Sequence, residues 1–152
     1  MPAAVAMPAS FTIDEARPED LPAIIVLDSK ITGIEKPEFW YGFYVPPGYG
    51  PRTFYVARVG SAVVGYVVGE VRAWEFGASP CGWLITIGIQ PEYRLAGIGT
   101  ALMRKLVALF ERMNVKRMRT MLHIDDHLLM SFFRSHGMTA GPYLQLEMPL
   151  EP

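Results

Sequence analysis

The chain has 152 residues, a length that suits a single domain with one hydrophobic core. Apolar residues make up 51% of it and charged residues 19%, and the formal net charge is −1, as in ordinary soluble globular proteins. Surfaces that bind nucleic acid are usually strongly basic, so this charge argues against a nucleic-acid partner. No apolar run approaches the length of a membrane span, and the single cysteine, Cys81, cannot form an internal disulfide.

The sequence predicts a short tail followed by one domain. Residues 1–10 are rich in Ala and Pro and lack the basic start and apolar run of a signal peptide, so we predict a flexible N-terminal tail there. Residues 11–152 contain no repeat and no low-complexity segment, and we predict that they form a single domain. Without a targeting signal or a disulfide pair, we expect a cytoplasmic protein with no membrane partner.

The apolar pattern predicts helices interleaved with strands. Alternating or β-branched runs predict strands over Phe11–Ala16, Thr53–Val59, Ala62–Arg72, Cys81–Ile89, Lys116–Ile124 and Thr139–Leu150, the last as a strand or a hairpin. Helical spacing predicts helices over Leu21–Asp28, Pro37–Tyr44, Gly97–Asn114 and Asp126–His136, the last ended by a left-handed Gly137. This order predicts a mixed α/β sheet, in which the two strands on either side of helix Gly97–Asn114 form a parallel βαβ unit.

One segment carries the chemistry, and it lies where strand Cys81–Ile89 ends and the long helix begins. It reads Ile89-Gln90-Pro91-Glu92-Tyr93-Arg94-Leu95-Ala96-Gly97-Ile98-Gly99-Thr100. Two glycines let backbone N–H groups approach a ligand closely, and a helix N-terminus adds unpaired donors and partial positive charge. The sequence therefore predicts a phosphate-binding loop, with Arg94 as a cation at its rim. The glycine spacing is neither that of a Walker A loop nor that of a dinucleotide fingerprint.

The segment resembles the pyrophosphate-binding motif of the GNAT superfamily of acyl-CoA-dependent N-acetyltransferases. Arg94-x-x-Gly97-x-Gly99 matches the family's Arg/Gln-x-x-Gly-x-Gly/Ala, and Ile89–Arg94 looks like its usual Val-x-Pro-x-Tyr-Arg lead-in. Asp126–Met138 is similar to the family's Asn…Phe-Tyr-x-x-x-Gly-Phe helix, and Phe11–Leu27 is similar to its first strand and helix. The resemblance extends from about Phe11 to Leu150.

The resemblance implies a GNAT fold, with a mixed central sheet of six to seven strands, about four flanking helices, and the parallel βαβ unit at the acyl-CoA cleft. It implies acetyl-CoA as the cosubstrate, and a strand-backbone N–H near Ile87–Ile89 that stabilises the oxyanion. The residues expected to bind the cofactor are Ile87, Gly88, Ile89, Arg94, Leu95, Ala96, Gly97, Ile98, Gly99, Thr100, Asp126 and Phe133.

Three positions depart from the family pattern. The family's tyrosine, often the acid that protonates the leaving thiolate, aligns with Phe133, which has no proton to donate. The asparagine that opens the same helix is Asp126, and the central-strand glutamate that often serves as general base is Trp83. At the aligned positions, this chain therefore has neither of the two side chains that usually act as acid and base in the family.

Transfer to an amine still requires a base, because an ammonium has no lone pair. The candidates are Glu75, Glu70 and Asp28, with His123 as a further possibility near the end of a predicted strand. Glu75 is the first choice, because the aromatics on either side of it could bury its carboxyl group. Taken singly, each candidate fits a solvated or structural polar residue better than a base.

For the acceptor we expect contacts from Trp40, Tyr44 and Trp83, although the aromatic run Phe39–Tyr44 could equally be core packing. Cys81 is expected to be buried and inert. We expect no metal, because the three histidines do not have zinc-ligand spacing.

The expected function is transfer of acetyl from acetyl-CoA to a primary amine, on a small molecule or on a protein lysine or N-terminus, by direct attack in a ternary complex. The expected oligomeric state is a monomer or a homodimer. An alternative enzymatic function is the transfer of a different acyl group, or the transfer of an acyl group to a nucleophile other than an amine. The alternative from another class is a catalytically silent acyl-CoA-binding or regulatory module on the same fold.

Overall fold

The computed structural model of the protein describes residues 10–151, so the tail predicted over residues 1–10 lies outside the described residues except for Ser10. Internal contacts divide the chain into a first unit that ends at Thr120 and a second unit that begins at Met121. Within residues 10–151 there is no helix that combines the length and the apolar character needed to cross a membrane.

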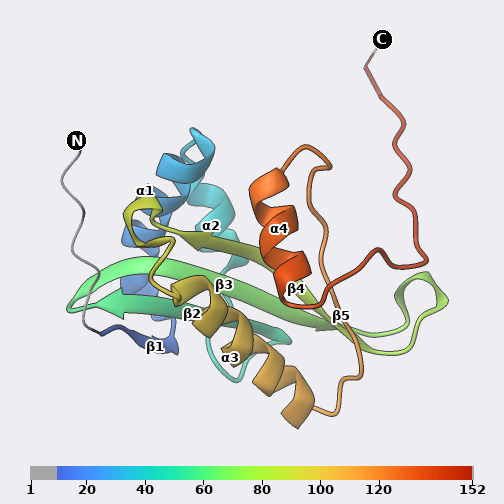
Figure 1. Ribbon diagram of the computed structural model, residues 1–152, viewed down its shortest axis with the longest axis horizontal. Coiled ribbons are helices and arrows are strands. Elements are labelled where there is room, and N and C mark those ends of the chain that lie inside the picture. Colours follow the sequence, from blue (N-terminus) through green and yellow to red (C-terminus); the bar gives the residue numbers. More distant parts are fainter. Residues whose placement is uncertain (1–9, 152) are drawn as a thin grey trace. The chain divides into compact units, whose positions relative to one another are not determined.

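The first unit is built on a five-stranded sheet whose strand order follows the sequence (Figure 1). The strands are β1 (Thr12–Glu15), β2 (Arg52–Val59), β3 (Ala62–Arg72), β4 (Cys81–Ile89) and β5 (Met118–Arg119). The pairs β1–β2, β2–β3 and β3–β4 are antiparallel, and β4–β5 is parallel. The predicted mixed sheet with a parallel βαβ unit is confirmed, with five strands among the described residues in place of six to seven.

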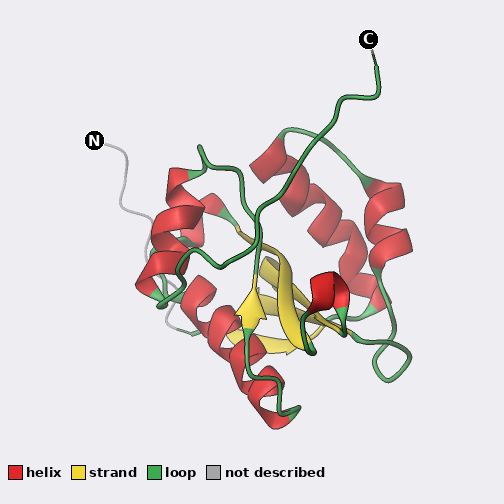
Figure 2. Ribbon diagram, turned by 90° about the vertical axis from the view of Figure 1, so that its right-hand side faces the viewer, coloured by secondary structure: helices red, strands yellow, loops and turns green. Residues whose placement is uncertain are grey.

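Three α-helices pack on the two faces of this sheet: α1 (Leu21–Thr32), α2 (Pro37–Phe43) and α3 (Ile98–Arg112). Figure 2 shows α3 on one side of the strands and α1 with α2 on the other. The α1–α2 face carries the buried cluster that includes Ile24, Trp40, Phe54, Tyr66 and Val68. Side chains alternate between the two faces of a strand, so Gly65 and Gly69, which flank Tyr66 and Val68 in β3, face α3.

Glycines on that face let α3 lie close to the sheet. A Cβ added at Gly82 in β4 would lie 2.5 Å from ring atoms of Phe110, and one added at Gly65 in β3 would lie 3.3 Å from the Ile98 side chain. These strand glycines are therefore packing residues, because a side chain there would push the helix away.

We expect Gly82→Ala to lower the free energy of unfolding by about 1–3 kcal/mol, the usual cost of overpacking a core. Gly42→Ala in α2 is the matched control, because nothing lies within 4 Å of an added Cβ there. Alanine is the better helix former by about 1 kcal/mol, so the control should be neutral or stabilising. Urea unfolding of both variants measures the difference, and equal effects would contradict the proposed role of Gly82.

The ladder between β3 and β4 contains a β-bulge. Val68 pairs with Thr86, whereas the next residue, Gly69, pairs with Leu84, so Ile85 is an extra residue in β4. A bulge shifts the alternation of side chains and backbone groups in the strand that carries it. On a given face of the sheet, the side chains of β4 therefore come from even-numbered residues on one side of the bulge and from odd-numbered residues on the other.

A buried ion pair ties the start of α1 to β2. The Asp20 carboxylate accepts hydrogen bonds from both terminal nitrogens of Arg58, each at 2.6 Å, and one from the amide of Arg17 at 2.8 Å. The side chains of Asp20 and Arg58 are only 6% and 10% exposed. A bidentate pair of this kind leaves neither buried charge without a partner.

Among its described residues the second unit contains one helix, α4 (His127–Ser135), close to the helix predicted over Asp126–His136. Asp126 caps it by accepting a hydrogen bond from the amide of Leu129 at 3.0 Å. The helix ends at Gly137, which has a φ of 86°. The amides of Gly137 and Met138 donate hydrogen bonds to the carbonyl oxygens of Arg134 and Phe133, respectively, which is a Schellman motif. The predicted left-handed glycine is confirmed.

Two strand predictions are corrected. The predicted strand Lys116–Ile124 is reduced to the two residues of β5, and the strand or hairpin predicted over Thr139–Leu150 is not formed among the described residues. Apolar residues still alternate there, but they are exposed: Leu144, Leu146, Met148 and Leu150 are 77–88% exposed. A segment with alternating apolar residues forms a strand only when a neighbouring strand supplies hydrogen bonds and a core covers one of its faces.

Candidate active site

The loop between β4 and α3 has the backbone geometry predicted for an anion site. Gly97 precedes the helix with a φ of 80°, a left-handed conformation, and no atom lies within 4 Å of a Cβ added there. Within the described residues, no side chain caps the helix. The first amides of α3, those of Ile98, Gly99 and Thr100, have no partner within the helix, as at any helix start. Open space and unpaired donors therefore coincide, which fits a pyrophosphate group.

The side chains of this loop divide into two groups. Arg94 and Leu95 are exposed, Leu95 by 90%, so both can reach a ligand at the rim. The side chain of Ile98 is fully buried and packs toward β3. For Ile98, the predicted cofactor contact can therefore involve only its backbone.

The amides predicted to stabilise the oxyanion, near Ile87–Ile89, lie at the end of β4. The amide of Gln90 donates to the carbonyl of Val64 on the β3 side at 2.8 Å. Amides alternate between the two edges of a strand, so those of Ile87 and Ile89 point toward the opposite edge. The strand β5 pairs with only two residues of β4, near the start of that strand. The amides of Ile87 and Ile89 thus lie beyond the parallel ladder.

A buried polar cluster lies on the α1–α2 face, next to the end of β4. The Asp28 carboxylate accepts a hydrogen bond from Trp40 Nε1 at 2.9 Å and one from the Tyr66 hydroxyl at 3.4 Å, and Lys36 Nζ lies 3.1 Å from it. The Tyr66 ring abuts β4, because a Cβ added at Gly88 would lie 2.5 Å from its hydroxyl oxygen. Burial, with the adjacent Asp28 carboxylate, raises the pKa of Tyr66 far above its ordinary value, so the phenol stays protonated and donates to Asp28.

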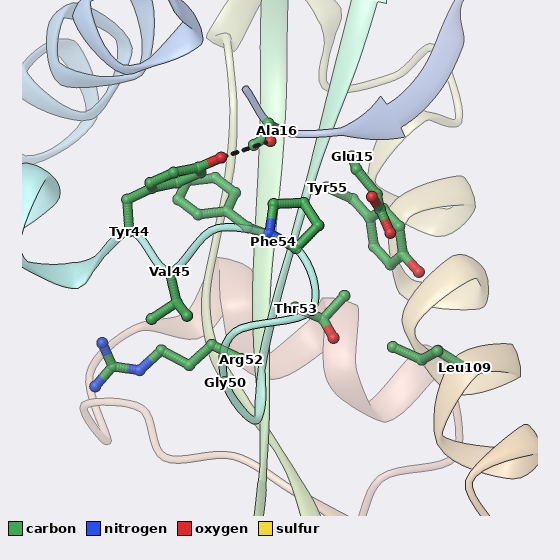
Figure 3. Close-up of a pocket in the computed structure, with 12 residues that line it drawn as sticks. Glu15, Ala16, Tyr44, Val45, Gly50, Arg52, Thr53, Phe54, Tyr55 and Leu109 are labelled. Carbon is green, nitrogen blue, oxygen red and sulfur yellow. Dashed lines mark hydrogen bonds between the residues drawn. The ribbon is translucent and has the colours of Figure 1, made fainter. Parts of the chain in front are cut away.

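The aromatic residues expected to bind the acceptor differ in their exposure. Trp40 is 1% exposed and packs edge-on against Tyr66 in the core, so core packing is the alternative that the structure favours for this ring. Tyr44 is partly buried against the same core cluster, and it also lines a cavity of about 150 Å³ between the start of β2 and the loop before it (Figure 3). Its hydroxyl donates to the carbonyl of Ala16 at 3.3 Å. This cavity is lined by residues such as Glu15 and Thr53, and it does not include the β4–α3 loop.

Glu70 and Trp83 are direct cross-strand partners in the β3–β4 ladder. Partners of this kind share a face of the sheet with their Cβ atoms about 5 Å apart. The Glu70 carboxylate lies 3.7 Å from the guanidinium of Arg52 and 3.5 Å from that of Arg72. The Arg72 guanidinium also lies 5.3 Å from the centre of the Trp83 ring, and the buried Trp83 Nε1 has no hydrogen-bond partner among the described residues.

The reason for preferring Glu75 as a base is wrong. The two flanking aromatics, Trp74 and Phe76, are 73% and 74% exposed and do not bury it. Both have positive φ angles, 63° and 52°, in the turn that follows β3. The Glu75 carboxylate is 44% exposed and lies 3.7 Å from Arg72. Sequence adjacency to aromatics did not produce burial, because this turn directs their rings into solvent.

The predicted residues of the second unit lie on or near α4. Asp126 is the helix cap described above, so its carboxylate already has a structural partner. Phe133 stacks edge-on with Phe132 at a centroid distance of 5.5 Å. The side chain of His123 is 75% exposed and lies 3.7 Å from Asp125. These three residues remain predictions as ligand-binding or catalytic groups.

Two residues of the polar cluster, Tyr66 and Lys36, were not predicted as site residues. Tyr66 interrupts a run of valines and glycines in β3, and Lys36 stands directly before the proline that begins α2. A phenol within a strand predicted to be buried needs a hydrogen-bond partner, which was the available signal for Tyr66. No local pattern connects Lys36 to Asp28, because their contact depends on how α1 and α2 pack.

Comparison with known proteins identifies the family. Residues 21–138 match the model of the acetyltransferase (GNAT) family. A search of curated proteins found no match. An aminoglycoside 6'-N-acetyltransferase from Acinetobacter baumannii is 14% identical over 93% of this chain and 100% of its own, with a TM-score of 0.78.

Two further solved structures have the same fold. A ribosomal-protein-alanine N-acetyltransferase from Brucella melitensis biovar Abortus 2308 is 14% identical over 93% of this chain and 100% of its own, with a TM-score of 0.75. An aminoglycoside N-acetyltransferase in complex with CoA is 12% identical over 96% and 99%, with a TM-score of 0.80. Identities this low support the fold alone, whereas the family model spans most of the sequence. The chain therefore belongs to the acetyltransferase (GNAT) family.

Proposed function

We propose that the protein transfers an acetyl group from acetyl-CoA to a primary amine by direct attack in a ternary complex. The observation that carries this proposal is the β4–α3 loop, where the open, left-handed Gly97 precedes uncapped helix amides. Donors of this kind, with Arg94 at the rim, suit the pyrophosphate of CoA. The family assignment supplies the acetyl donor.

The chemistry requires stabilisation of the charge that develops on the thioester oxygen. A C–N bond forms while the carbon–sulfur bond breaks, the sulfur leaves with the electron pair, and the nitrogen loses a proton. The amides of Ile87 and Ile89 are the donors we assign to the oxygen, because they point to the edge of β4 beyond its ladder with β5. This contribution comes from backbone amides and not from a side chain. It is therefore unaffected by the presence of Trp83 where the family often has a glutamate.

We assign proton uptake to Glu70, directly or through water, in preference to Glu75 and Asp28. Glu70 is the cross-strand partner of Trp83, the position that often carries the base in this family. Its carboxylate therefore lies on the same face of the sheet, close to where the family's glutamate would stand. Asp28 already has three partners, and Glu75 lies in an exposed turn.

The primary test is an acetyl-transfer assay. The protein is incubated with acetyl-CoA and a panel of primary amines, and free thiol release is followed. We expect amine-dependent thiol release and thermal stabilisation by CoA. Stabilisation without thiol release for any amine would instead indicate a silent acyl-CoA-binding module, and absence of both effects would contradict the proposal.

We expect Glu70→Gln to lower kcat by about 100-fold, because general base catalysis contributes about 10²–10⁴. The matched control is Glu75→Gln, which removes the other carboxylate beside Arg72 and should leave kcat within about twofold of the wild type. The pH dependence of kcat/KM separates proton transfer from altered packing, because the Glu70→Gln variant should regain rate as pH rises and more amine is neutral. A larger loss in the Glu75 variant would reverse the assignment.

A further inference from the structure

The Asp28 carboxylate is a buried anion whose charged partner can leave. Its side chain is 5% exposed, whereas that of Lys36, which supplies the only ammonium among the partners the structure assigns it, is 35% exposed. The other two partners, Trp40 Nε1 and the Tyr66 hydroxyl, are neutral donors held in the core. A buried carboxylate without a cation nearby is energetically unfavourable. If Lys36 moved away, another cation that paired with Asp28 would therefore be strongly favoured.

Lys36 is held in place by few other interactions. It lies at the end of the connection between α1 and α2, where Gly33 has a φ of 79° and Ile34 is 63% exposed. It is also the residue directly before the first turn of α2, and a cation is unfavourable at the positive end of a helix. Its ammonium lies 5.8 Å from the centre of the half-exposed Phe39 ring. The Lys36 side chain can therefore swing into solvent without disturbing the core.

The carboxylate is connected to the reactive end of β4 through one side chain. The Tyr66 hydroxyl donates to Asp28, and the same Tyr66 ring abuts the backbone at Gly88. Gly88 lies between Ile87 and Ile89, the residues whose amides we assign to the thioester oxygen. An ammonium bound at Asp28 would thus lie on the α1–α2 face, near the part of β4 where transfer is proposed to occur.

We propose that Asp28, with the ring of Phe39, is an ammonium-binding site for the acceptor, and that Lys36 occupies it until the acceptor arrives. The Lys36 side chain is itself a primary ammonium on an aliphatic chain, so it marks the chemistry that the site accepts. An ammonium paired with Asp28 has no lone pair and cannot be the attacking group. The preferred acceptor therefore carries at least two amino groups, one bound as an ammonium at Asp28 and the other neutral at the thioester. This inference rests on the proposed acetyl transfer.

The test compares linear α,ω-diamines of four to eight carbons with alkylamines of the same lengths, with acetyl-CoA at saturation. In the wild type, at least one diamine should have a KM about tenfold or more below that of its matched monoamine. Asp28→Asn should remove this difference, and Lys36→Met should enlarge it by removing the internal competitor. Lys30→Met is the control, because Lys30 is a lysine on α1 that the structure does not pair with Asp28.

Thermal unfolding provides a readout without turnover. Lys36→Met should melt below the wild type, and a diamine should restore more of the lost Tm than its matched monoamine, whereas Asp28→Asn should show no such selectivity. Equal KM values for diamines and monoamines in the wild type, with transfer intact, would overturn the inference and leave the proposed function standing. Absence of transfer to every amine would instead overturn the proposed function. If Lys36→Met only lost stability, with unchanged KM values and no selective rescue, the Asp28–Lys36 pair would be purely structural.

Discussion

Gly97→Val should weaken CoA binding by about a hundredfold or more. Gly97 has a φ of 80°, which β-branched residues tolerate poorly, and an added side chain would project into the open space beside the first amides of α3. Loss of two charge-assisted hydrogen bonds at about 1.5 kcal/mol each corresponds to about this factor in Kd. Isothermal titration with CoA measures the change, and circular dichroism checks that the fold is retained.

A second left-handed glycine controls for backbone strain. Gly77 has a φ of 72° and no atom within 4 Å of an added Cβ, and it precedes the start of β4, whereas the loop follows its end. Gly77→Val should therefore carry a similar strain and bind CoA with unchanged affinity. Wild-type affinity in Gly97→Val would show that the β4–α3 loop is not the phosphate site.

Asp20→Asn should lower the free energy of unfolding by about 3–5 kcal/mol at pH 7, because it leaves the buried Arg58 guanidinium without its charged partner. Asp14→Asn is the matched control. Asp14 lies 3.5 Å from the same guanidinium, but its side chain is 58% exposed. Exposed pairs contribute at most about 1 kcal/mol, so the control should change little. Equal losses in the two variants, measured by urea unfolding, would contradict the role of burial.

The stability due to Asp20 should depend on pH in one direction. Burial of its carboxyl group acts to raise the pKa, but hydrogen bonds from Arg58 and from the Arg17 amide outweigh it and hold the pKa below its ordinary value. A group with a lowered folded-state pKa stabilises fully above its unfolded-state pKa, about 3.9 for aspartate, and loses this effect as pH falls through the folded value. The difference between wild type and Asp20→Asn should therefore be constant near neutrality and shrink below about pH 4.

Much of the fold could be predicted from the sequence because its signals are local. The alternation in β2 and β3, the helical spacing of α3 and the glycines around its start are each set by neighbouring residues. The loop motif was recognisable for the same reason, since a phosphate site at a helix N-terminus uses consecutive backbone amides. The left-handed Gly97 and Gly137 follow from the absence of a Cβ.

The sequence by itself thus determined the family, the order of the elements and the loop that binds CoA in our proposal. Only the tertiary structure decided which carboxylates matter, because burial and pairing depend on residues distant in the chain. Glu75 is exposed despite its aromatic neighbours, Glu70 pairs in register with Trp83, and the partners of Asp28 come from α2, its N-terminal flank and β3. The bulge at Ile85 is equally non-local, because it exists only in the register between two strands.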